Sequence, residues 1–127
     1  MNADTTKVNA ISKRIIGCAY NVGNALGCGF FEKVYENALM HELKKDGLRA
    51  ERQKRFSIIY DGVGVGDYIA DLVVEDLVIV ETKAVDVLDD IHVAQCLNYL
   101  KATGLKLALL LNFGAPRIAV KRIINKF

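Results

Sequence analysis

The centre of the chain reads Tyr68-Ile69-Ala70-Asp71-Leu72-Val73-Val74-Glu75-Asp76-Leu77-Val78-Ile79-Val80-Glu81-Thr82-Lys83. Its two apolar halves are rich in β-branched residues and meet at Glu75-Asp76, which predicts two neighbouring strands over residues 66–74 and 77–84. Asp71 and Glu81 place charge within these strands. Charge on an apolar strand is costly unless a partner charge or a metal ion compensates it. The stretch therefore predicts a hairpin and a candidate site together.

The turn between the two strands determines whether the acids share a face. Successive side chains on a strand point to opposite faces, so Glu81 and Lys83 lie on the same side of their strand. A two-residue turn would set Asp71 opposite Val80 and leave Glu81 on the far face. A three-residue loop, Glu75-Asp76-Leu77, would instead set Asp71 opposite Glu81, with Cβ atoms about 5 Å apart. We predict the odd-length loop, or a bulge with the same effect.

Hydrophobic periodicity predicts the remaining elements and their order. A period of 3.6 residues marks helices, and alternation or short apolar runs mark strands. The predicted helices cover residues 5–26, about 31–47 and 88–103, and the predicted strands cover 56–60, 66–74, 77–84, 107–113 and 118–124. The order α-α-β-β-β-α-β-β predicts an α/β (α+β) fold with one mixed central sheet flanked by helices.

Length and composition favour a single domain over residues 1–127. The chain has 127 residues, 52% of them hydrophobic, and one proline, which suffices for one core but not for two. No apolar run approaches the roughly 20 residues of a membrane helix, and the N-terminus lacks a basic-then-apolar signal. We therefore expect a cytoplasmic protein. The net charge of +2 neither demands nor excludes a polyanionic partner.

The cysteines do not indicate a metal or disulfide framework. Cys18, Cys28 and Cys96 are odd in number and follow no C-x-x-C spacing, unlike the cysteines of zinc sites or disulfide-rich domains. We expect each to be a small apolar residue.

Two carboxylates at the spacing of Asp71 and Glu81 can hold a divalent cation. Oxygen ligands favour Mg²⁺ or Mn²⁺, which bind one or two carboxylates together with waters and substrate phosphate. Such an ion lowers the pKa of a water and neutralises charge that grows on a phosphoryl oxygen. Lys83 could orient that water or stabilise the transition state. The spacing alone leaves an alternative open, namely a plain ion pair of Lys83 with Glu81 or Asp71.

Two helices carry further candidates. Glu32 and Tyr35 share a face of the second helix, where Glu32 could point toward the sheet as a third carboxylate. The alternative for Glu32 is an exposed first-turn residue that the helix dipole favours. On the third helix, His92, Gln95 and Tyr99 share a face, and Gln and Tyr can bind phosphate while Tyr can also stack on a base. The alternative there is a satisfied amide and a tyrosine packed in the core.

Taken together, these residues resemble the bacterial GxxExxY family, a branch of the PD-(D/E)XK nuclease superfamily. The naming motif is Gly29-Phe30-Phe31-Glu32-Lys33-Val34-Tyr35, which Glu36 continues. The resemblance runs from about Ile11 to Ile124. It includes residues 68–72, 80–84, 91–95, 98–104 and 111–114.

The resemblance implies a restriction-endonuclease-like core and a metal-dependent nuclease that hydrolyses phosphodiester bonds of DNA, with RNA as the second choice. It implies Asp71, Glu81 and Glu32 as ligands of Mg²⁺ or Mn²⁺ and Lys83 as the catalytic lysine. Gln95 and Tyr99 look like the Q-x-x-x-Y element of the recombination-exonuclease branch, which lies beside the active site and would contact nucleic acid.

The chain departs from the family pattern at two positions. Gly23 follows Val22 where the family commonly has histidine, and Cys28 stands where it often has proline. Neither position removes one of the ionisable site residues, which favours a live site. A second hypothesis stays open: a catalytically silent nucleic-acid-binding or protein-interaction module on the same fold. A lone nuclease core has little surface for choosing a substrate, so a homodimer or a larger partner protein could supply specificity.

Overall fold

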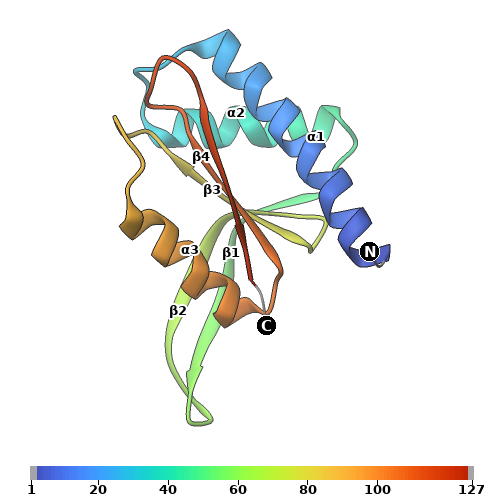
Figure 1. The fold of residues 1–127 in the computed structure, drawn as a ribbon, viewed down its shortest axis with the longest axis vertical. Coiled ribbons are helices and arrows are strands. Elements are labelled where there is room, and N and C mark those ends of the chain that lie inside the picture. Colours follow the sequence, from blue (N-terminus) through green and yellow to red (C-terminus); the bar gives the residue numbers. More distant parts are fainter. Residues whose placement is uncertain (1–2, 126–127) are drawn as a thin grey trace.

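A computed structural model describes residues 3–125 of the chain (Figure 1). Within this range, the elements follow one another in the predicted order α-α-β-β-β-α-β-β. None of the helices in this range is both long and apolar enough to cross a membrane. The elements are α1 (Ala3–Leu26), α2 (Glu32–Lys45), β1 (Ala50–Tyr60), β2 (Val63–Val74), β3 (Val78–Lys83), α3 (Asp90–Thr103), β4 (Leu107–Asn112) and β5 (Ala119–Ile124).

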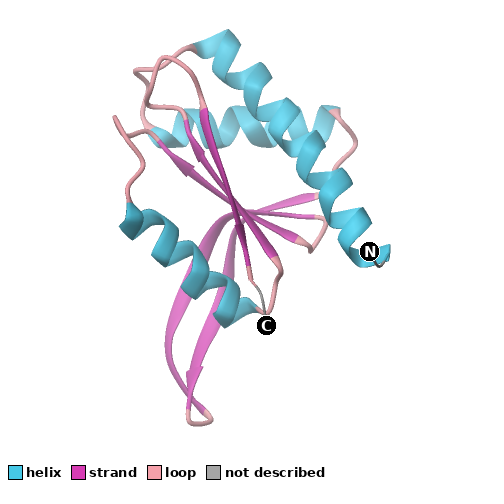
Figure 2. Cartoon of the chain, viewed as in Figure 1, coloured by secondary structure: helices cyan, strands magenta, loops and turns pink. Residues whose placement is uncertain are grey.

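The strands form one mixed sheet in the order β1-β2-β3-β4-β5. β3 and β4 are parallel, and α3 connects them, whereas the other neighbouring strands are antiparallel. Figure 2 shows α3 on one side of the strands and α1 and α2 on the other. This arrangement confirms the predicted mixed sheet flanked by helices and is consistent with a restriction-endonuclease-like fold.

Two apolar cores lie on the two faces of the sheet. The first core packs α1 and α2 against one face, and the second core packs α3 against the other, which we call the α3 face. Every residue of β4 is buried, as expected of a strand covered by helices on both sides. Along β3, Val80 belongs to the first core and Ile79 to the second. Cys18 and Cys96 are buried in these cores as expected, but Cys28 is exposed.

β1 and β2 form a hairpin that is longer than the sequence predicted. Its outer half projects away from the rest of the protein (Figure 1) and exposes Ile59, Tyr60, Val63 and Val65. The prediction missed residues 50–55 of β1, which are mostly charged or polar, and residues 63–65 of β2, where glycine interrupts the apolar pattern, so periodicity did not mark these ends. The backbone pairing of the hairpin, from Ala50 with Val74 out to Tyr60 with Val63, defines the strands instead.

The loop between β2 and β3 has the predicted odd length. Val74 pairs with Val78, which leaves Glu75, Asp76 and Leu77 in the loop. Glu75 and Asp76 have φ angles of 53° and 55°, and the Leu77 N–H donates to the Val74 carbonyl at 3.0 Å. Two consecutive residues with positive φ form the kind of tight turn that matches the twist of a hairpin. The predicted three-residue loop is therefore confirmed.

The end of β4 is bound to the segment that follows β3. The buried Asn112 side chain accepts from the N–H groups of Val85 and Gly114, both at 3.0 Å, and donates to the Val85 carbonyl at 2.9 Å. The Phe113 N–H donates to the Lys83 carbonyl at 2.8 Å. A Cβ atom on Gly114 would lie 2.4 Å from the Val85 nitrogen and oxygen, so only glycine allows this close approach.

Replacing Asn112 by alanine should lower the free energy of unfolding by about 2–3 kcal/mol, because the Val85 and Gly114 backbone groups lose their partner. Urea denaturation measures this change. Asn98→Ala, at an exposed position of α3, is the matched control and should change stability by less than about 0.5 kcal/mol. Equal effects of the two substitutions would show that the Asn112 contacts do not hold the strand ends together.

Candidate active site

Asp71 and Glu81 lie opposite each other on the α3 face of the sheet. The β2–β3 pairing ends with Leu72 opposite Val80, and the next position of the same register places Asp71 opposite Glu81. Asp71 Oδ2 accepts from the Thr82 N–H at 2.9 Å and from Thr82 Oγ1 at 3.2 Å. The Asp71 carboxylate is thus fixed to β3 by a main-chain donor at the point where the ladder ends.

Glu81 is a buried acid with only 7% of its surface exposed. The Tyr68 hydroxyl donates a hydrogen bond to Glu81 Oε1. Burial, followed by the neighbouring Asp71 charge, raises the pKa of Glu81 to about 8, whereas the Tyr68 hydrogen bond and the Lys83 charge act in the opposite direction. An isolated pair of acids in this position therefore resists full ionisation at neutral pH, and a bound cation would reverse that preference.

A stack of three aromatic rings holds the hydroxyl that binds Glu81. The Tyr68 ring lies 3.6 Å from the Tyr99 ring and 6.0 Å from the Phe56 ring, between centroids, and is nearly parallel to both. Burial raises the pKa of Tyr68, so its hydroxyl stays protonated and acts as a donor. Because Tyr99 belongs to α3, the stack connects this helix to the acid on β3.

Lys83 lies two residues beyond Glu81 and is half-buried. Its charge lowers the pKa of Glu81, so the two side chains interact electrostatically. Among residues 3–125, no carboxylate oxygen lies within 4.0 Å of the Lys83 ammonium. The plain ion pair that the sequence left open is therefore not formed, and the ammonium is available to a ligand.

Glu32 is not brought to the two acids. It is the exposed first residue of α2, and α2 packs on the opposite face of the sheet. The expectation that Glu32 points toward the sheet is wrong because the first turn of α2 extends beyond the packed part of the helix, where Phe31 is 88% exposed. In the described part of the chain, no three or more His, Cys, Asp or Glu side chains gather as a metal-binding group.

The acid of α2 that the fold does bury is Glu36, one turn after Glu32. Its carboxylate accepts from the Gln53 amide at 3.0 and 3.2 Å, from Arg52 at 3.1 Å and from Lys33 at 3.0 Å. Two cations and an amide compensate this buried charge, so Glu36 ties α2 to β1 and needs no metal.

The candidates on α3 have different surroundings. Tyr99 is half-buried in the aromatic stack, whereas Gln95 is exposed one turn earlier on the same side of the helix. His92 forms a capping box with Asp89: the Asp89 N–H donates to His92 Nδ1 at 3.2 Å. The structure thus places Tyr99 close to Glu81, leaves Gln95 open to solvent, and gives His92 a structural contact.

Tyr68 is the site residue that sequence reasoning missed. Strict alternation places Tyr68 and Asp71, three residues apart, on opposite faces of β2. Strict alternation would also keep Tyr68 and Leu72, four residues apart, on the same face. In the structure Tyr68 belongs to the second core and Leu72 to the first, so the alternation shifts between them. Gln53 lies across from this shift on β1 with a φ of 52°. The proximity of an aromatic residue to the acid was the only signal in the sequence.

The chain belongs to the PD-(D/E)XK nuclease superfamily, whose family model matches residues 9–123. In structure it is similar to the protein of the crystal structure of SSO0001, with a TM-score of 0.56 and 20% sequence identity. This similarity covers 76% of the present chain and 51% of the other, so the chain spans about half the length of that protein. At this identity the likeness concerns the fold. No curated protein matches the chain significantly.

Without divalent cations, wild-type protein should lose stability relative to Glu81→Gln as the pH rises from about 5 to 8. The folded-state pKa of about 8 lies above the value of 4.5 that is ordinary for a glutamate, so in this window the folded state holds a proton that the unfolded state has released. Raising the pH therefore favours unfolding, by about 1 kcal/mol per pH unit. Urea denaturation across this range measures the effect, and Glu32→Gln is the matched control. A stability difference that is constant with pH would contradict the assignment.

Proposed function

We propose that this chain is a metal-dependent nuclease that hydrolyses phosphodiester bonds of DNA, within the GxxExxY branch of its superfamily. The observation that carries this proposal is the register that sets Asp71 opposite Glu81, with Lys83 beside them. The three residues match the D…(D/E)-x-K pattern that names the superfamily. A phosphodiester at this position would meet two acids and an ammonium on one face of the sheet.

The two acids fit Mg²⁺ or Mn²⁺, which are held by one or two carboxylates with waters completing the shell. Asp71 and Glu81 would hold the ion, and Glu32 is left out of this set because it is exposed at the start of α2. When bound, the ion would neutralise charge at the scissile phosphate and acidify the attacking water. The buried Glu81 carboxylate and the half-buried Asp71 carboxylate repel each other and would be stabilised by such a cation.

Each site residue then has a separate task. Tyr68 and Thr82 fix the two carboxylates, so that they are oriented before substrate arrives. Lys83 would donate a hydrogen bond to a non-bridging phosphate oxygen as negative charge grows there. Gln95, exposed on α3, would bind a neighbouring phosphate of the nucleic acid. The exposed part of Tyr99 would contact the nucleic-acid strand.

We also propose that residues 1–127 form one nuclease-like domain that acts in the cytoplasm of a bacterium and prefers DNA to RNA. Several basic side chains of β1 are already paired with acids, as in Arg52–Glu36, Lys54–Asp76 and Arg55–Asp67. Paired cations contribute less to binding of a phosphate backbone. A second copy of the chain or a larger partner protein would then supply part of the nucleic-acid surface.

A second candidate function is a binding module without catalysis. It is favoured by one observation: within residues 3–125, no third acid joins Asp71 and Glu81. Such a module would bind DNA in a salt-dependent way, with an affinity indifferent to metal and to both acids.

Purified protein with Mg²⁺ or Mn²⁺ should cleave a DNA substrate, and Glu81→Gln or Lys83→Met should each reduce the rate at least about 100-fold, because each removes charge stabilisation at the reacting phosphate. Rates are measured on single-stranded, linear duplex and supercoiled DNA, with RNA for comparison. Glu32→Gln is the matched control and should retain activity. Cleavage that survives both site substitutions would remove these residues from the mechanism.

Mn²⁺ should bind the wild-type protein and raise its melting temperature, because the cation binds the folded state alone. Asp71→Asn and Glu81→Gln should abolish this shift, and Glu32→Gln should keep it. Differential scanning fluorimetry across a Mn²⁺ series measures the effect independently of activity. Identical shifts in all four proteins would place the cation elsewhere and favour the binding module.

A further inference from the structure

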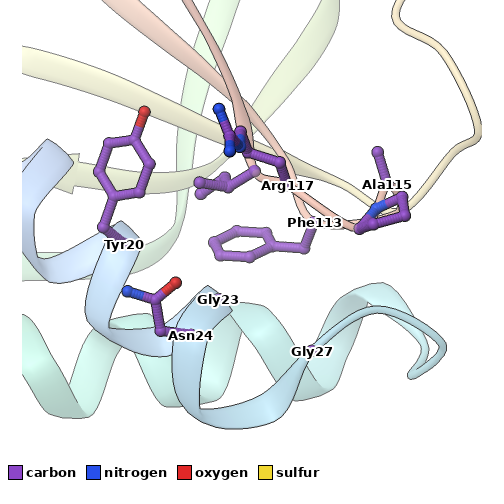
Figure 3. A pocket seen from close by; sticks show the side chains of 9 residues that line it. Tyr20, Gly23, Asn24, Gly27, Phe113, Ala115 and Arg117 are labelled. Carbon is purple, nitrogen blue, oxygen red and sulfur yellow. The ribbon is translucent and has the colours of Figure 1, made fainter.

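A second concave site lies on the opposite face of the sheet from the acids. This cavity has a volume of about 290 Å³. Figure 3 shows the side chains that line it, from α1 and from the segment that joins β4 to β5. Phe113, part of the first core, contributes to its wall. Gly23 keeps the α1 side open: a Cβ atom there would already lie 3.6 Å from Ile118 and 3.9 Å from Phe113. A longer side chain at this position would fill the cavity.

Three polar side chains border the cavity. Tyr20 and Asn24 rise from α1, and Arg117 faces them from the loop (Figure 3). Among the described residues, no acid lies within 4.0 Å of the Arg117 guanidinium. The side chains of Tyr20, Asn24 and Arg117 make no hydrogen bond with this part of the chain. The cavity therefore has a positive charge and hydrogen-bonding groups available to a ligand.

The opposite walls favour a flat ring. Phe113 is held by stacking on Tyr35, at 4.8 Å between centroids and 7° between planes, and only 2% of its surface is exposed. The half-buried Ile118 and Gly23 therefore supply the rest of the apolar wall. At the end of α1 the Gly23 carbonyl accepts from the Gly27 N–H at 2.9 Å and the Gly27 carbonyl accepts from the Tyr35 hydroxyl at 2.6 Å. The last-turn carbonyl groups between them, beginning with that of Asn24, carry the negative end of the helix dipole and can accept hydrogen bonds. An anion is therefore favoured at Arg117, and a ring bearing N–H groups is favoured beside α1.

We propose that this cavity binds one nucleotide, with its base beside Phe113 and its phosphate at Arg117. The volume lies at the low end for ligand sites, which suits a single base and excludes a large cofactor. The nucleotide could be free or part of a nucleic-acid strand. For the strand-bound form the inference rests on the proposed function, whereas binding of a free nucleotide does not depend on it.

The position of the cavity would allow one nucleic-acid strand to reach both the cavity and the acids. Lys83 pairs with Asn112 on the adjacent parallel strand, and the Phe113 N–H donates to the Lys83 carbonyl at 2.8 Å. The cavity and the acids therefore lie at the same end of the sheet, one strand apart but on opposite faces. A strand cut at Asp71 and Glu81 could place a neighbouring nucleotide over this sheet end.

The test is calorimetric titration of the full chain with dAMP, in EDTA so that the acid site is inactive. We expect dAMP to bind more tightly than deoxyadenosine or inorganic phosphate. Arg117→Ala removes a charge-assisted hydrogen bond, and Gly23→Leu fills the cavity while favouring the helix, so each should weaken binding at least about tenfold. Lys121→Ala, an exposed cation on β5, is the matched control and should not weaken it.

A second arm separates the two sources of the nucleotide and the two proposals. Binding of a short 5′-phosphorylated oligodeoxynucleotide that weakens in both cavity variants assigns the site to a strand, and weakening of dAMP binding alone assigns it to free nucleotide. Glu81→Gln should leave dAMP binding unchanged, so loss of nuclease activity and loss of this site are distinguishable. Absence of dAMP binding by the wild type, or equal binding by wild type and both cavity variants, would overturn the proposal.

Discussion

The candidate site depends on the length of one loop. Because Glu75, Asp76 and Leu77 separate the paired residues Val74 and Val78, the register of β2 against β3 brings Asp71 to Glu81. One residue more or less would send one carboxylate to the other face of the sheet, under α1 and α2. The Arg49 N–H donates to the Glu75 carboxylate at 2.6 Å and the Glu75 N–H to the Arg49 carbonyl at 2.9 Å, so the segment entering β1 holds this loop in place.

The order of elements and the hairpin register could be predicted because each depends on local pattern. Buried helices and strands need apolar residues at fixed periods, and those periods were present except in the largely polar first half of β1 and at the glycine-containing start of β2. The register followed from a discrete choice between two loop lengths. Positions that depend on contacts distant in the sequence were harder: Tyr68 reaches Glu81 only because β2 changes its alternation opposite Gln53.

The second helix, α2, shows the same limit of prediction from local pattern. Spacing placed Glu32 and Tyr35 on one helical face, and Tyr35 is indeed fully buried. Whether the preceding turn is covered depends on where the sheet ends, which helical periodicity does not contain. Glu36 occupies the covered position instead, where Arg52, Gln53 and Lys33 compensate its charge. The two buried acids of the domain thus differ: Glu36 has cationic partners from the protein, whereas Glu81 has a tyrosine hydroxyl and a neighbouring acid.

The segment Asn112-Phe113-Gly114 contributes to both faces of the sheet at once. Its amide and backbone groups hold Val85 and Lys83 on one side, and its aromatic ring lines the cavity on the other. Evolution therefore cannot readily alter these three residues for the benefit of one site without disturbing the other. A change in ligand preference at one of the two surfaces would therefore have to come from substitutions at flanking positions, with residues 112–114 unchanged.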